Sequence, residues 1–186
     1  NDETVYDARR AVGMVFQNPE GSLNPKHTIG KILSDAMLFH KITDRTHVKE
    51  KCEEWIERME LPKDTLCRYP ASFSGGQKQR LSIARAICRH PEILIFDDSF
   101  SALDYKTDRV LQRILQLMKE LKKEMGLTIL FISHDMGVIY DICDEVAVMR
   151  DGRIEETGEK EDFFAKPKTE YGQLLLDSVP KLPYLE

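Results

Sequence analysis

Residues 72–80 read Ser-Phe-Ser-Gly-Gly-Gln-Lys-Gln-Arg, and a short helix later residues 93–98 read Ile-Leu-Ile-Phe-Asp-Asp. Two adjacent glycines, Gly75 and Gly76, at the start of a helix leave backbone N–H groups at its positive end, where a phosphate is favoured. An apolar strand that ends in two carboxylates is a place where nucleotide-bound Mg²⁺ can be held. Together the two stretches predict nucleotide chemistry on an α/β fold.

Outward from these stretches, apolar strands and amphipathic helices alternate, as a parallel sheet requires. The sequence predicts strands at 11–16, 93–97 and 127–133, and a long helix at 105–125 that Gly126 closes. Asp151-Gly152 between two short apolar runs predicts a β-hairpin. The predicted fold class is therefore α/β with a mostly parallel sheet.

Helical periodicity predicts a separate helical subdomain at 28–70, with helices at 28–39 and 44–60 that each bury one face. A core at 71–158 and a C-terminal tail at 159–186 complete the predicted organisation. Asn18 to Ser22 has the composition of a loop. The helix that begins near Gly75 should stop at Pro91. Arg80 and Arg85 are expected on its solvated side, with contact to acidic partners as the alternative.

Composition excludes several classes of function. The formal charge is −5 and the pI is about 5.6, which argues against nucleic-acid binding. The longest apolar runs are far too short to cross a bilayer. The four cysteines form no Cys-x-x-Cys pair and favour free thiols. The histidines other than His134 form no ligand spacing and are predicted to lie at the surface.

The order of motifs from Gln17 to His134 resembles the core of an ABC-type ATPase. In that family the residues around Gln17 form the Q-loop, 72–80 the signature, 93–98 the Walker B strand, and Ser101-Ala102-Leu103-Asp104 the D-loop. The resemblance implies a P-loop NTPase-like fold and the cofactors ATP and Mg²⁺. It also implies that two such domains sandwich two nucleotides between them.

The resemblance implies a role for each motif residue. The signature residues Ser74, Gly75, Gly76 and Gln77 would close on the γ-phosphate of a nucleotide bound to the opposite subunit, and Asp104 would lie beside that nucleotide. The metal and catalytic residues it implies are Asp97, which would hold Mg²⁺ through water; Gln17, which would reach the Mg²⁺ or the attacking water; and His134, which would hydrogen-bond the γ-phosphate.

Two positions depart from the family pattern. Asp98 stands where the family usually has a Glu that orients or deprotonates the attacking water, and its side chain is one methylene shorter. Ser99 stands where a proline is often found, which frees a backbone N–H. The sequence therefore predicts slow hydrolysis at this site.

The sequence contains no Gly-Lys-Ser or Gly-Lys-Thr loop, which such an ATPase uses to wrap the β- and γ-phosphates. We expect the chain to be the C-terminal part of a longer protein, with a sheet that is incomplete at its N-terminal side. On its own, the chain should not bind ATP usefully and should be inactive as an ATPase.

Residues 17–25 resemble the Q-loop of the peptide and nickel importer ATPases, and residues 167–180 resemble their tail. This implies an ATP-hydrolysing importer subunit at the cytoplasmic face of the membrane. Its expected partners are integral-membrane permease subunits, a second identical or different ATPase subunit and, indirectly, a solute-binding protein. Two alternatives are a slowly hydrolysing regulatory partner subunit, favoured by Asp98, and a soluble ABC protein with no membrane partner.

Overall fold

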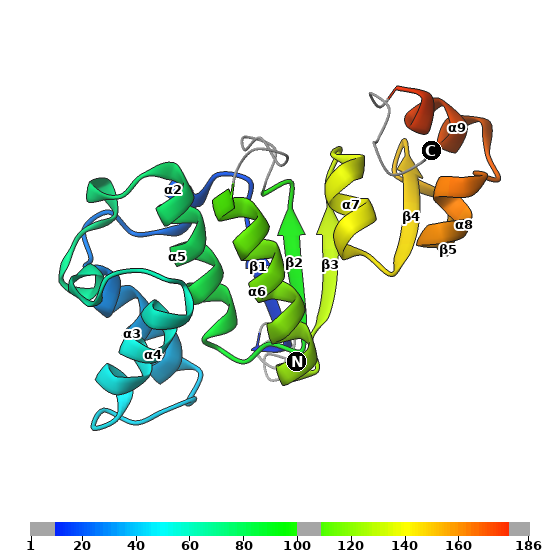
Figure 1. The fold of residues 1–186 in the computed structure, drawn as a ribbon. Coiled ribbons are helices and arrows are strands. Elements are labelled where there is room, and N and C mark those ends of the chain that lie inside the picture. Colours follow the sequence, from blue (N-terminus) through cyan, green and yellow to red (C-terminus); the bar gives the residue numbers. More distant parts are fainter. Residues whose placement is uncertain (1–9, 100–108, 179–186) are drawn as a thin grey trace. The chain divides into compact units, whose positions relative to one another are not determined.

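The computed structural model describes residues 10–99 and 109–178, and its ribbon is drawn in Figure 1. Its contacts divide the chain into two compact units, residues 1–132 and residues 133–186. Each unit is described by itself below.

The first unit contains a parallel sheet of three strands in the order β1-β2-β3. The strands are β1 (Val12–Val15), β2 (Ile93–Asp97) and β3 (Thr128–Ile132), and all are rich in β-branched or aromatic residues, which suit a pleated surface. In the register, Val15 lies beside Phe96, which lies beside Phe131. The predicted parallel sheet is confirmed.

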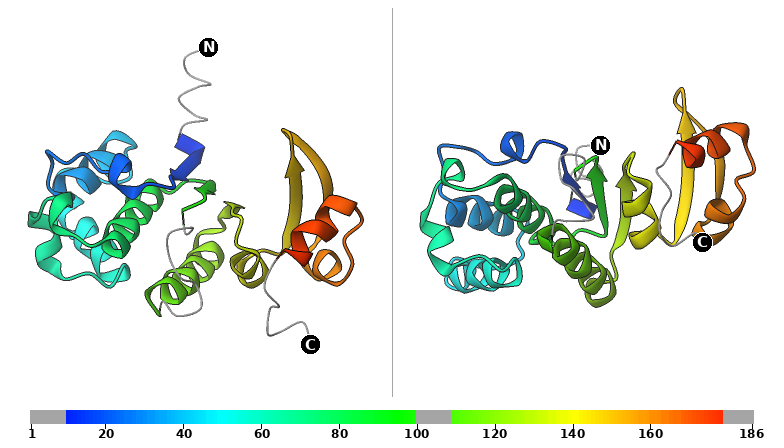
Figure 2. Two further views of the ribbon diagram at one scale, coloured as in Figure 1. Left: turned by 90° about the horizontal axis from the view of Figure 1, so that it is seen from above. Right: turned by 45° about the horizontal axis from the view of Figure 1, so that its top comes forward.

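Two helices, α5 (Gly75–Ile87) and α6 (Arg109–Met125), cover one face of this sheet (Figure 1). Gly13 permits the close approach of α5, because a Cβ at that position would lie 3.1 Å from the carbonyl oxygen of Ala86. On the same face the rings of Phe96 and Phe131 stack with centroids 4.9 Å apart. Figure 2 shows the ribbon from two further directions.

The opposite face of the sheet is mostly apolar and partly exposed among the described residues of the first unit. Its side chains alternate with those that contact the helices, as the period of two requires. Leu130 is 51% exposed and Ile132 is 48% exposed, whereas Leu94 and Phe96 on the covered face are fully buried. A parallel sheet normally buries both faces, so this face is unusual for such a fold.

The helical segment consists of α3 (Ile29–Phe39), α4 (Val48–Arg58) and two short 3₁₀ turns at Lys63–Cys67 and Pro70–Ser72. The Thr28 hydroxyl accepts a hydrogen bond from the Lys31 amide and caps α3. The core residues of this segment, all buried, are Ile29, Ile32, Leu33, Met37, Cys52, Trp55, Ile56, Met59 and Leu61. Two amphipathic helices thus bury their faces against each other, as predicted.

Three local predictions were wrong. Helix α4 begins at Val48 rather than near Asp44, because the Asp44 carboxylate accepts hydrogen bonds from the amides of Thr46 and His47 and forms a turn. Pro19–Ser22 is the short helix α2, not a loop, and proline suits its first position. His40, predicted at the surface, is buried at the C-terminal end of α3.

The second unit contains α7 (Met136–Ile142), the antiparallel strands β4 (Glu145–Arg150) and β5 (Arg153–Glu159), α8 (Lys160–Ala165) and α9 (Glu170–Asp177). The predicted hairpin is confirmed: Asp151 and Gly152 both have positive φ, 50° and 76°, as a tight turn between antiparallel strands needs. The buried carboxylate of Glu156 accepts hydrogen bonds from the amides of Lys168 and Thr169 and holds the start of α9 on the hairpin.

None of the helices within the described ranges is both long and apolar enough to traverse a lipid bilayer.

Candidate nucleotide-binding site

The signature residues form a capped helix N-terminus. Ser74 precedes α5, its hydroxyl accepts from the Gln77 amide, and the Gln77 side chain accepts from the Ser74 amide at 3.0 Å. This capping box satisfies two of the backbone donors at the start of the helix. The remaining N–H groups of the first turn point along the positive end of the helix dipole, where an anion is stabilised.

Gly75 is not required by the packing or the backbone of the described residues. A Cβ at this position would meet nothing within 4 Å, and Gly75 is not among the residues with positive φ. Glycine in a helix costs free energy relative to alanine, so folding alone does not explain it. The open space in front of Gly75 is suited to the close approach of a group from outside the chain.

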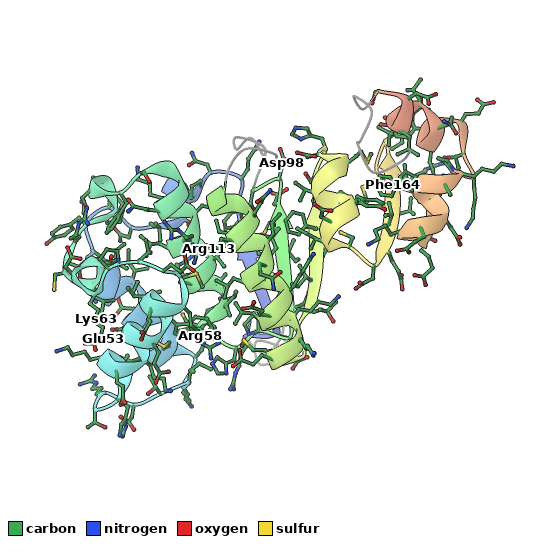
Figure 3. The ribbon with its side chains drawn as sticks, in the orientation of Figure 1. Glu53, Arg58, Lys63, Asp98, Arg113 and Phe164 are labelled. Carbon is green, nitrogen blue, oxygen red and sulfur yellow. The ribbon has the colours of Figure 1, made fainter. Side chains whose placement is uncertain are left out.

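Asp97 and Asp98 lie at the C-terminal end of β2, which is the edge where ligands bind in open parallel sheets. Asp98 has a φ of 44° and its amide donates to the carbonyl of Ile132 at 2.8 Å. Its carboxylate accepts a hydrogen bond from Gln17 Nε2 at 3.1 Å. Two residues that the sequence places 81 positions apart therefore meet at one point (Figure 3, Asp98 labelled).

A buried contact that sequence reasoning missed joins the signature helix to this strand end. The Gln79 side chain, which is 4% exposed, donates to the Ser99 carbonyl. The Ser99 hydroxyl in turn donates to the carbonyl of Val15 in β1 at 2.8 Å. Ser99 therefore connects the ends of two strands through its hydroxyl, a bond that proline could not make. The sequence carries no signal for this link, because the burial of Gln79 and Ser99 depends on tertiary packing.

A second contact joins the Q-loop to the signature helix. The hydroxyls of Ser22 in α2 and Ser82 in α5 lie 2.6 Å apart, and the Ser22 hydroxyl also donates to the carbonyl of Pro19. The Q-loop segment is therefore packed on the same helix whose N-terminus carries the signature. A displacement of α2 would therefore alter its contact with α5.

Two predicted site residues are not among the described residues of the first unit. His134 belongs to the second unit, immediately before Asp135, whose carboxylate caps α7 by accepting from the amides of Gly137 and Val138. Asp104 and the rest of the predicted D-loop lie outside the described residues. Within the first unit, the structure brings the side chains of Gln17 and Asp98 together. Asp97 directly precedes Asp98 at the end of β2.

The donors at this strand end fit magnesium. Over the described residues, no three or more His, Cys, Asp or Glu side chains gather as a metal site of their own. Mg²⁺ commonly takes only one or two protein carboxylates and completes its shell with phosphate oxygens and water. Asp97 could supply such a carboxylate, and with its amide nitrogen turned to Asp98, Gln17 keeps its amide oxygen as a further oxygen donor.

The fold and the arrangement of motifs define an ABC-type ATPase domain. Residues 1–101, more than half of the 186, match the family model described as ABC transporter. The chain belongs to the ABC transporter family.

Known proteins support this assignment. A putative peptide import ATP-binding protein of Brucella ovis is 40% identical over 172 residues, which cover 92% of this chain and 53% of that protein. The dipeptide transport ATP-binding protein DppF of Escherichia coli is 41% identical over 94% of this chain and 51% of its own. The chain thus spans about half the length of the curated relatives it matches.

A solved structure shares the fold. The ATP-binding cassette MJ0796, in a dimeric post-hydrolysis state with ADP and Pi, superposes with a TM-score of 0.73 at 28% identity over 86% of this chain and 68% of that one. The predicted fold class, an ABC ATPase fold, is confirmed.

Proposed function

We propose that the whole protein is the ATP-hydrolysing subunit of an ABC importer that takes up peptides. The observation that carries the proposal is the hydrogen bond between Gln17 and Asp98, because it joins the Q-loop to the acidic end of β2. The relatives named for peptide and dipeptide transport support the choice of solute class over nickel, the other solute suggested by the sequence.

The chain's own residues have distinct tasks in this proposal. Asp97 and Gln17 would hold Mg²⁺, which, when bound to ATP, neutralises phosphate charge. Asp98 accepts a proton from the attacking water or orients it. Gly75, Gly76 and the capped start of α5, with Ser74 and Gln77, bind the γ-phosphate of a nucleotide held by the partner subunit. His134 and Asp104 contribute to the same two-subunit site.

The phosphate-cradling loop is a separate requirement. Since this sequence contains no Gly-Lys-Ser/Thr loop, we propose that the rest of the protein supplies it, together with the cover for the exposed face of the β1-β2-β3 sheet. In this scheme residues 28–70 form the helical subdomain, 71–158 the core and 159–186 the tail.

The proposed partners follow from the same scheme. The ATPase would act at the cytoplasmic face of the membrane, paired with an identical or different ATPase subunit and docked to integral-membrane permease subunits that receive solute from a binding protein. The contact of α2 with α5 through Ser22 and Ser82 offers a route by which a movement at the Q-loop reaches the signature.

The test is hydrolysis and peptide uptake by the full-length protein, assembled with its permease subunits in vesicles. Asp98→Asn should lower single-turnover hydrolysis by about 10²-fold or more, because a general base contributes about 10²–10⁴-fold. Asp98→Glu should raise it by about tenfold or more, since the carboxylate gains the missing methylene. Asparagine tolerates the positive φ at 98, so the fold should persist.

Asp151→Asn is the matched control. Asp151 also has positive φ, but it lies in the hairpin turn of the second unit. We expect the Asp151→Asn variant to hydrolyse ATP at the unaltered rate. If neither Asp98 variant alters the rate, Asp98 is not the base and the regulatory-subunit alternative is favoured. If ATP turnover occurs without any dependence on a membrane partner, the soluble alternative is favoured.

A further inference from the structure

The end of helix α4 has an unusual residue in a glycine position. The amide of Leu61 donates to the carbonyl of Ile56, and the amide of Glu60 donates to the carbonyl of Glu57. This pair of bonds is the Schellman motif, in which the residue after the helix cap adopts a left-handed conformation and is usually glycine. Here that residue is Glu60, with a φ of 53°. A side chain with a Cβ is strained in this region, and the contacts of Glu60 can offset that cost.

Glu60 contacts two other helices. Its carboxylate lies 2.7 Å from Nε of Arg113 in α6. Its carbonyl accepts a hydrogen bond from Arg80 Nη1 of α5 at 3.2 Å, and the same nitrogen donates to the carbonyl of Met59 at 2.9 Å. The earlier expectation that Arg80 is simply solvated is therefore wrong. One residue at the end of α4 meets both the signature helix and the helix that follows the predicted D-loop.

A cavity and a second charged contact lie beside Glu60, between α4 and α6. A cavity of about 310 Å³ lies there, with Arg58, Glu60, Arg80 and Arg113 among its lining residues. At its far side, Arg58 forms two hydrogen bonds with Glu124 of α6, at 2.8 and 3.0 Å. Arg58 and Arg113 are labelled in Figure 3, on α4 and α6 respectively. Met59, Ile114 and Leu117 also line the cavity, so apolar side chains and exposed charged pairs share this junction.

Lys41 has the same helix-end conformation as Glu60 but no such side-chain contact among the described residues. The end of α3 repeats the motif, with the amide of Ile42 bonded to the carbonyl of Met37 and a φ of 56° at Lys41. The Lys41 side chain is exposed, and no ion pair links it to any residue in the described part of the chain. Lys41 and Glu60 therefore share a strained conformation and differ in whether the side chain joins another helix.

We propose that Glu60 is a positioning residue for hydrolysis, which holds the signature helix at a fixed place relative to α6 through Arg80 and Arg113. The inference rests on the proposed function, because the signature must meet a nucleotide on the partner subunit. Glu60 contacts neither Gln17 nor Asp98 in the described contacts and acts only through α5 and α6.

Glu60→Gly separates this role from a structural one. Glycine relieves the strain at φ 53° and keeps the backbone carbonyl that Arg80 contacts, but it removes the carboxylate. In the full-length transporter, we expect kcat for ATP to fall about threefold to tenfold while KM stays unchanged, because misplacement slows reaction without weakening nucleotide binding. The thermal midpoint should stay the same or rise. Lys41→Gly, the matched control, should raise the midpoint and leave kcat unchanged.

Exchanging the two charges of the Glu60–Arg113 pair should restore kcat for ATP. Arg113→Glu alone should lower kcat, and Glu60→Arg combined with Arg113→Glu should recover most of it, since the ion pair is re-formed. A kcat that is unchanged in Glu60→Gly, or a loss that the reversed pair does not recover, would overturn the proposal.

A distance measurement tests the linkage without any hydrolysis. Spin labels at the exposed positions Glu50 on α4 and Lys119 on α6, with exposed Cys67 replaced by serine, should give a narrow distance distribution that broadens in Glu60→Gly and not in Lys41→Gly. An unchanged distribution in Glu60→Gly contradicts the linkage. A wild-type transporter that hydrolyses no ATP overturns the proposed function instead, and the spin-label distances then decide the linkage by themselves.

Discussion

The helical segment and the sheet of the first unit bury their apolar residues to different extents. In the helical segment, α3 and α4 enclose Ile29, Leu33, Met37 and Ile56, which are all at most 1% exposed. In the sheet, one face is buried under α5 and α6, while Leu130 and Ile132 on the other face are about half exposed. The same chain therefore contains a closed core and an open one.

The difference shows which part of the fold is stabilised by contacts among the described residues. Burial of apolar surface stabilises at roughly 25 cal/mol per Å² removed from water. The helical segment gains this from contacts within itself, whereas the open face of the sheet gains little until another element covers it. An uncovered apolar face also favours association with other chains. The sheet is thus the part whose stability depends on what lies outside the described residues.

The sharpest test of this contrast compares Ile56→Ala with Ile132→Ala in the 186-residue chain. Ile56 is fully buried and its truncation should cost about 2–5 kcal/mol, because a cavity remains in a packed core. Ile132 should cost well under about 1 kcal/mol, as surface substitutions usually do. Urea unfolding followed by circular dichroism measures both. Equal losses would show that the open face is packed in solution.

Sequence patterns predicted the strands and helices of these two regions, but not which face of the sheet is covered. The runs 93–96 and 129–132 are continuously apolar, which is typical of parallel strands buried on both faces. Nothing in such a run tells which face is covered. The start of α4 was misplaced because the side chain of Asp44 competes for backbone amides, and α2 was missed because four residues carry no periodicity.

For the candidate site, motif order predicted the residues, and tertiary contacts decided how they meet. The sequence placed Gln17 before the signature and Asp98 after it, but their hydrogen bond joins residues far apart in the chain. The link from Gln79 through Ser99 and the role of Glu60 could not be predicted, because each depends on a contact between separate helices and strands. The left-handed conformation of Glu60 could not be predicted either, because glycine is the residue that usually marks this conformation in a sequence.

Gly75→Ala tests a position in α5 that packing among the described residues does not explain. Alanine should raise stability by a few tenths to about 1 kcal/mol, since it is the better helix former and its Cβ meets open space. Hydrolysis by the full-length protein should fall, because the methyl group occupies the approach of the partner's nucleotide. Thermal unfolding and ATP turnover, measured on one preparation, check both. A more stable variant with unchanged turnover would contradict the assignment of Gly75 to the site.

A smaller effect is expected from His40, which lies in the buried end of the helical segment. Burial, together with the charges of Arg89 and Arg10, lowers the pKa of His40 below its usual value. The unfolded chain therefore takes up a proton near pH 6.5 while the folded chain does not. Stability should be full above that pH and should fall as the pH drops below it. His40→Gln should flatten the slope of unfolding free energy against pH over this range. An unchanged slope would mean that His40 is not a source of this dependence.

The last comparison uses two cysteines of the helical segment as reporters of its opening. Cys52 in α4 is 1% exposed and burial raises the pKa of its thiol, whereas Cys67 in the first 3₁₀ turn is exposed. At pH 8 iodoacetamide should modify Cys67 readily and should reach Cys52 only when the helical segment opens, because the thiolate is the nucleophile. The Cys52 rate then measures the opening free energy, and Ile56→Ala should raise it about tenfold for each 1.4 kcal/mol lost. Ile132→Ala should leave that rate unchanged if the two regions open independently. Mass spectrometry of the alkylated peptides measures each site, and a Cys52 rate that follows Ile132 as closely as Ile56 would show that sheet and helical segment unfold as one.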